Sequence, residues 1–181
     1  MINKTVYYTL SQVGILIELR KLWEQHVFWT RSFIISTAAG LGDLDAVTRR
    51  LMRNPADFAV LFRRFYGNET AASFEDLLSN HLQIGGDLVK AAKNNDVTGA
   101  DAARRKWYEN ADEIAAFLAS VNPCWDEETW KRLLYNHLEM TEKEASLRLA
   151  GRYEEDVAIF DVIEAEALKM ADYMFCGFRY S

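Results

Sequence analysis

Apolar side chains recur three and four residues apart around each of the three histidines, which is the spacing of the buried face of an α-helix. Around His26 the apolar stripe comprises Leu19, Leu22, Trp23, Trp29, Phe33 and Ile34. Around His81 it comprises Phe74, Leu77, Leu78, Ile84, Leu88 and Val89. Around His137 it comprises Trp130, Leu133, Leu134 and Met140, and then fades at Glu144 and Ala145. The pattern predicts three helices that each carry one histidine on or near the core face.

Turn signals follow each of these helices. The segments "AGLGD", "KNNDVTGAD" and "AGRYEED" contain Gly and Asn, which close helices because they tolerate positive φ. Second helices are expected to start near Asp43, Gly99 and Glu154, and the longer loops "YGNETAAS" and "VNPCWDEE" are expected to join the hairpins. Pro55 lies inside the first of these second helices and should kink or interrupt it. We therefore expect six helices of about 20 residues.

The hairpins resemble one another in sequence. "LLSNHLQ" and "LLYNHLE" place His81 and His137 in one setting 56 residues apart, and "LWEQHVF" places His26 another 55 residues upstream. The repeats run over residues 15–70, 71–126 and 127–181. The predicted fold is all-α: one domain, residues 1–181, in which three αα-hairpins form an antiparallel up-down bundle with ferritin-like or four-helix-bundle-like packing.

Composition narrows the class of protein further. Of 181 residues, 50% are apolar and 27% are charged, which indicates a globular chain. A net charge of −6 without a basic run disfavours a nucleic acid or an anionic membrane surface as partner, and no apolar stretch is long enough to span a bilayer. Only two cysteines, Cys124 and Cys176, and no signal peptide pattern favour a reduced cytoplasmic protein, although the two could pair.

Each histidine has a polar counterpart on the following helix. His26 lies 28 residues before Asn54, His81 lies 29 before Asn110, and His137 lies 29 before Glu166. Because helices rise 1.5 Å per residue and the hairpin turns fall midway, both members of each pair return to one height. Odd-numbered helices of an up-down bundle are parallel, so all three pairs should share one layer.

This layer predicts a mononuclear metal site. His26, His81, His137 and Glu166 would bind one Zn, Fe, Ni or Cu ion, and Asn54 and Asn110 would orient the imidazoles from behind. Haem is a lesser option, since two facing histidines can ligate it. An open coordination position would permit modest redox or hydrolytic chemistry. Whether the protein is an enzyme stays open, because no nucleotide-binding loop, nucleophile elbow or zinc-protease motif occurs.

The alternative is a non-catalytic structural or protein-interaction bundle. In it, each histidine is a core residue that forms a hydrogen bond with its Asn or Glu counterpart, because buried polar groups need partners. Duplication of one hairpin would copy such a residue as readily as a ligand. The aromatic termini "YYTL" and "YMFCGFRYS" would then close one end of the bundle, contact a protein partner or form a homo-oligomer.

The strings "LWEQHVFWTRSFIISTAAGLGDL", "RKWYENADEIAAFLASVNP" and "HLEMTEKEA" resemble a small family of uncharacterised bacterial proteins of this length. The resemblance covers nearly the whole chain and implies a small helical bundle. Members often carry the label acetylglutamate kinase, which implies an α/β sandwich with Gly-rich phosphate loops; this chain has neither feature. "HVFWTR" is also similar to ferritin-like metal-binding bundles, whose additional Glu and His ligands are missing here.

Overall fold

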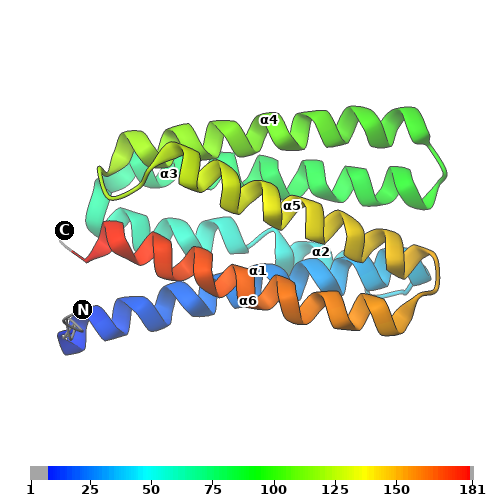
Figure 1. Ribbon diagram of the computed structural model, residues 1–181, viewed down its shortest axis with the longest axis horizontal. Helices are drawn as coiled ribbons and strands as arrows, with labels where there is room; N and C mark the ends of the chain where they lie inside the picture. Colours follow the sequence, from blue (N-terminus) through cyan, green and yellow to red (C-terminus); the bar gives the residue numbers. More distant parts are fainter. Residues whose placement is uncertain (1–7, 180–181) are drawn as a thin grey trace, which may run out of the picture.

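The computed structural model describes residues 8–179, and within them the chain is helical, with no strand. The helices are α1 (Leu10–Ala39), α2 (Leu44–Leu51), α3 (Asn54–Lys93), α4 (Val97–Val121), α5 (Glu127–Leu149) and α6 (Tyr153–Phe178). Five long helices pack along one axis and the short α2 lies at one end (Figure 1). The predicted all-α bundle is confirmed.

Local sequence accounts for the helix ends. Thr9 caps α1 in a capping box with Gln12, and Gly40 ends the helix at a φ of 64°. Asp96 and Asp126 accept hydrogen bonds from the first turns of α4 and α5. Pro55 falls in the first turn of α3, so the helix expected from residue 43 onward is divided into α2 and α3.

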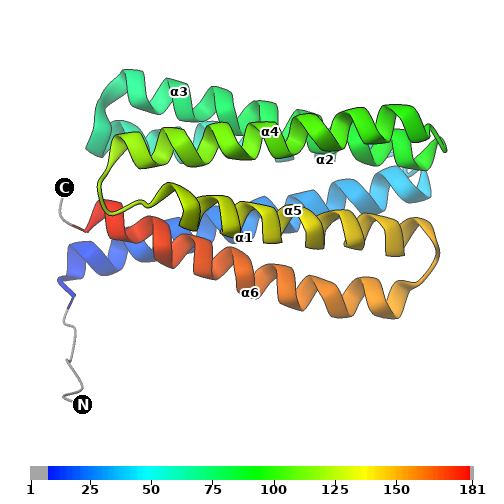
Figure 2. The ribbon, with the colours of Figure 1, turned by 45° about the horizontal axis from the view of Figure 1, so that its top comes forward.

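The first inter-hairpin connection differs from expectation. "YGNETAAS" was expected to be a loop, but it lies inside the 40-residue α3, whose only non-helical residue is Gly67, with φ 82° and ψ 178°. This conformation is open essentially to glycine alone, and it turns the chain within a single residue. Residues 54–66 and 68–93 consequently run in opposite directions along the bundle (Figure 2).

The order of the helices brings distant segments side by side. The helix α1 packs against α6 and α3, while α4 packs against α3 and α5. The free ends of α1 and α6 lie at the same end of the bundle (Figure 1), where the ring of Tyr8 meets Phe175 at 5.5 Å. Part of the aromatic termini, Tyr7 and residues 180–181, lies outside the described residues.

The core contains most of the predicted stripe residues. Near the free ends of α1 and α6 it is filled by stacked and edge-on aromatic rings: Phe62, Phe74, Trp125 and Phe178. Cys124 and Cys176 are both free thiols and half-buried. Across residues 8–179, the helices all fall short of the length and apolarity that crossing a membrane requires.

Candidate metal centre

The three histidines meet inside the bundle. His26 comes from α1, His81 from α3 and His137 from α5, and each side chain is about 2% exposed. The ring centroid of His26 lies 5.5 Å from that of His137 and 6.4 Å from that of His81. Residues separated by 55 and 56 positions in the chain therefore share one level, which we call the histidine layer.

Two of the three expected polar pairs are formed. His26 Nδ1 lies 3.0 Å from Asn54 Oδ1, and His81 Nδ1 lies 2.9 Å from Asn110 Oδ1. Each asparagine is itself held in place, because its Nδ2 donates to a backbone carbonyl of the histidine's helix: Asn54 to Leu22 at 3.0 Å and Asn110 to Leu77 at 3.2 Å. An amide whose nitrogen donates to one carbonyl must present its oxygen to the imidazole.

This orientation determines the tautomer of both imidazoles. Because Asn Oδ1 can only accept, the Nδ1 atoms of His26 and His81 carry the protons and donate them. The remaining nitrogen, Nε2, is then an unprotonated acceptor with its lone pair directed away from the asparagine. This is the arrangement found in metal-binding histidines, whose second nitrogen donates to a partner behind the ring.

The third pair is not formed. Glu166 is buried, but its carboxylate accepts a hydrogen bond from Lys169 Nζ at 3.0 Å, one turn along α6. His137 Nδ1 is buried and has no hydrogen-bond partner among the described residues. Glu166 also lines neither of the two cavities that touch the histidine layer. Its role as a fourth ligand therefore stays a prediction.

Burial keeps the imidazoles neutral. It lowers the pKa of His26 to about 4, against a smaller opposing effect of the Asn54 hydrogen bond. Burial, with repulsion from His26, lowers the pKa of His81 to about 3, and the same causes hold the pKa of His137 well below 6.5. At neutral pH no proton competes with a metal ion for these nitrogens.

The distances between rings test the fit to a metal. With Zn–N bonds of about 2.1 Å and a ring radius of about 1.1 Å, the centroids of two imidazoles on one tetrahedral ion lie about 5 Å apart. The His26–His137 distance of 5.5 Å is close to this value, and the His26–His81 distance of 6.4 Å is wider by about 1.4 Å. Accordingly, no group of three His, Cys, Asp or Glu side chains within residues 8–179 is already drawn together for a metal.

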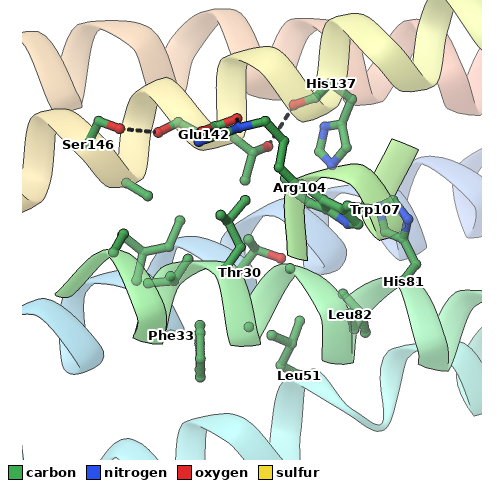
Figure 3. A pocket seen from close by; sticks show the side chains of 18 of the residues that line it. Thr30, Phe33, Leu51, His81, Leu82, Arg104, Trp107, His137, Glu142 and Ser146 are labelled. Carbon is green, nitrogen blue, oxygen red and sulfur yellow. Dashed lines mark hydrogen bonds and ion pairs between the residues drawn. The ribbon is translucent and has the colours of Figure 1, made fainter. Parts of the chain in front are cut away.

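Cavities lie on both sides of the layer. The small cavity, about 10 Å³, faces the aromatic core and is bordered by Trp23, Phe74, Trp130 and Met174. The large cavity, about 110 Å³, lies between α1, α3, α4 and α5, toward the α2 end of the bundle (Figure 3). All three histidines line both cavities. A ligand in the large cavity therefore has direct access to the histidine layer.

Several residues at this site were missed by sequence reasoning. The ring of Trp107 lies 5.3 Å from that of His81, and Gly85 makes room for it, because a Cβ there would come within 3.0 Å of the indole. Arg104 on α4 reaches across to Glu142 on α5, with Nε donating to both carboxylate oxygens at 2.8 and 3.0 Å (Figure 3). The Gly85–Gly86 pair inside a predicted helix was the one signal of close packing in the sequence.

A second polar cluster lies on the other side of α5. Arg31 on α1 donates to Asp156 Oδ1 at 2.8 Å and to Glu144, and both carboxylates are almost fully buried. Burial raises the pKa of Glu144 to about 7, against the opposing effect of Arg31. Glu144 thus marks the point where the apolar stripe of α5 becomes an internal ion-pair network.

Comparison with known proteins adds no assignment: no protein-family model, curated protein or solved structure matches this chain. The resemblances to a small bacterial family and to ferritin-like bundles stay predictions. The function must be argued from the site alone.

Proposed function

We propose that this protein binds a single transition-metal ion through His26, His81 and His137, with Asn54 and Asn110 orienting two of the imidazoles. The observation that supports it best is the pair of Nε2 lone pairs directed away from fixed asparagines, in a layer where a third imidazole lies 5.5 Å from the first. Three neutral imidazoles suit Zn, Fe, Ni or Cu. Haem is the lesser candidate, because the large cavity of about 110 Å³ is small for the macrocycle.

Binding draws the rings together. His81 would move toward His26 by about 1.4 Å to reach the ligand distance, a shift within the range of small side-chain and helix adjustments. Three imidazoles would leave at least one position of a four-coordinate ion free, and the adjoining large cavity would give water or a small molecule access to it. Such a position makes modest hydrolytic or redox chemistry accessible. Glu166 reaches the ion only if it exchanges Lys169 for the metal.

The alternative proposal is a non-catalytic structural or protein-interaction bundle. The two His–Asn bonds support it equally, because they satisfy buried polar groups without any metal. The unpartnered His137 Nδ1 favours a metal that His137 binds through Nδ1, since a purely structural histidine would leave this buried atom unsatisfied at a cost of about 1–3 kcal/mol. In this alternative, the aromatic ends around Tyr8 and Phe175 contact a protein partner or a second copy of the chain.

Two further proposals concern the origin of the three hairpins and the cellular location of the protein. We propose that the three hairpins of residues 15–70, 71–126 and 127–181 derive from one repeated unit and pack in a ferritin-like manner within one domain. Repetition of the His–Asn pair at 55–56-residue intervals supports this. The net charge of −6 supports a protein without nucleic acid partners, and two free thiols support the cytoplasm as its location.

The test of the proposed metal is elemental analysis of protein purified without an affinity tag, followed by titration of chelator-treated protein with Co²⁺. One equivalent of metal and the intense visible absorption of tetrahedral Co²⁺ are expected. Both should disappear in His81→Ala and persist in Asn80→Ala, which changes the exposed neighbour of His81. Glu166→Gln separates a three-histidine site, which it leaves intact, from a site that includes the carboxylate. Absence of stoichiometric metal in both experiments would leave the structural alternative.

A further inference from the structure

The large cavity is bounded by small and apolar side chains. Its walls combine Gly85 and Gly86 with the side chains of Phe33, Ile34, Leu51, Leu82, Leu88, Val89, Ala92, Ala100 and Ala145. A volume of about 110 Å³ is comparable with an apolar cavity of about 150 Å³ that binds benzene or xenon in another protein. The space is therefore large enough for one small molecule about the size of a single ring.

The cavity exists because of particular residues. Three alanines from three helices, the buried Ala100 on α4 and Ala145 on α5 and the exposed Ala92 on α3, line one space that larger side chains would fill. Gly86 contributes no side chain, and a Cβ there would only touch the Phe33 ring at 3.4 Å. Protein cores are normally packed without voids of this size, so the space is exceptional within this bundle.

The polar groups are concentrated at the histidine layer. Thr30 and Thr141 line the cavity, but their hydroxyls already donate to the backbone carbonyls of His26 and His137 at 2.8 Å. The hydroxyl oxygens of both threonines and the Nε2 atoms of His26 and His81 are therefore hydrogen-bond acceptors. Two orphaned groups lie in the wall: His137 Nδ1, and the indole N–H of Trp107, which is buried beside His81 and has no partner among the described residues.

These groups define the head of a ligand. An acceptor nitrogen on His81 and a donor on Trp107, with ring centroids 5.3 Å apart, are both satisfied by one hydroxyl group, which donates to the imidazole and accepts from the indole. A ligand group that can only accept a hydrogen bond satisfies Trp107 alone, and one that can only donate satisfies His81 alone. An apolar body then fills the space between the three alanines.

The rim excludes charged molecules. Arg104 and Glu142 line the cavity, and Arg104 is already paired with Glu142 and also with Asp101. No unpaired charge in the wall therefore compensates an incoming ion, whose desolvation in an apolar cavity is strongly unfavourable. Arg104 is 39% exposed, so this bridge between α4 and α5 lies where the cavity meets solvent and a ligand would enter.

We propose that the large cavity is a binding site for a small, uncharged alcohol or phenol, with its hydroxyl at His81 and Trp107 and its apolar body between Ala92, Ala100 and Ala145. The inference needs no metal, because it rests on the cavity and its hydrogen-bonding groups. In metal-loaded protein the ion would occupy the His81 lone pair that the hydroxyl uses, so the inference is stated for the metal-free chain, where its failure is distinguishable from that of the metal proposal.

The experiment is calorimetric and NMR titration of the chelator-treated full chain with phenol, toluene and benzoate. Phenol should bind at one site, toluene about tenfold more weakly for lack of the hydroxyl, and benzoate more weakly still for its charge. Ala145→Leu fills the cavity and should weaken phenol binding by at least about tenfold, whereas Ala116→Leu, the same change at an exposed position of α4, should leave it unaltered.

Ala100→Leu fills the same cavity from the opposite wall and replaces Ala145→Leu if that variant does not fold, as judged by circular dichroism. Phenol binding that persists in a folded cavity-filling variant would overturn the proposal, because the ligand would then lie elsewhere. Equal affinity for benzoate and phenol, or no binding of phenol up to its solubility, would overturn it as well.

Discussion

The bond between His81 and Asn110 is the feature on which both proposed functions depend, and a double-mutant cycle measures it. Asn110→Leu removes two hydrogen bonds, from His81 Nδ1 and to the Leu77 carbonyl, and leaves a buried imidazole N–H without a partner. Lost bonds of about 1 kcal/mol each and an orphaned donor of about 1–3 kcal/mol predict destabilisation of about 3–5 kcal/mol. His81→Leu should cost about 1–3 kcal/mol, because it orphans only the Asn110 oxygen.

The double variant should be more stable than the sum of the single costs predicts, by at least about 2 kcal/mol, because no orphaned imidazole or amide then remains. Urea unfolding followed by circular dichroism, with chelator present, gives all four free energies of unfolding. Asn80→Leu, on the exposed face beside His81, is the control and should change stability by at most about 0.5 kcal/mol. Additive costs within about 0.5 kcal/mol would refute the assigned His81–Asn110 bond.

Two further predictions concern pH and the backbone. Because the pKa values of His26 and His81 are lowered from 6.5 to about 4 and about 3, the unfolded chain takes up protons first as the pH falls. The stability that the two neutral histidines contribute should be fully present above pH 6.5 and should decrease as the pH falls from 6.5 toward 4. The free energy of unfolding should fall by up to about 1.4 kcal/mol per pH unit for each histidine. Glu144, with its pKa raised from 4.5 to about 7, opposes this decrease over that interval, so Glu144→Gln should make urea-unfolding stability fall more steeply with acid; an unchanged slope contradicts the assignment. Separately, Gly67→Ala should cost about 1–3 kcal/mol of thermal stability through backbone strain alone, since no atom lies within 4 Å of the added Cβ. The matched Gly14→Ala, inside α1 and equally free of neighbours, should stabilise by about 0.5–1 kcal/mol, and equal effects of the two would contradict the strain.

Sequence periodicity was sufficient for the helices and for the meeting of the histidines. Turn signals near Gly99 and Glu154 located the starts of α4 and α6 to within two residues, and the equal distances from each histidine to its hairpin turn placed His26 with Asn54 and His81 with Asn110. Both inferences depend only on helix rise and on antiparallel order, which hold for any straight hairpin.

The sequence pattern could not predict features that depend on the direction of individual side chains. Glu166 lies on the helix that the prediction gave it, but its carboxylate accepts a hydrogen bond from Lys169 and does not pair with His137. The side-chain rotamer, rather than the position along the helix, determines this direction. The cavity is a space between Ala92, Ala100 and Ala145, and no pattern of apolar residues distinguishes a filled core from an unfilled one. The expected loop "YGNETAAS" is a helix that turns at the single residue Gly67. The sequence could not distinguish these outcomes, because the composition of the segment suits a loop and a glycine bend equally.

The central claim, that three imidazoles bind one ion, is tested most directly by X-ray absorption at the zinc edge of protein loaded with one equivalent of Zn²⁺. The account predicts three imidazole nitrogens at about 2.0–2.1 Å and one oxygen ligand completing a four-coordinate shell. In His137→Ala the imidazole contribution should fall to two or the zinc should be lost. A six-coordinate shell of oxygen ligands, or three imidazoles that persist in His137→Ala, would contradict it.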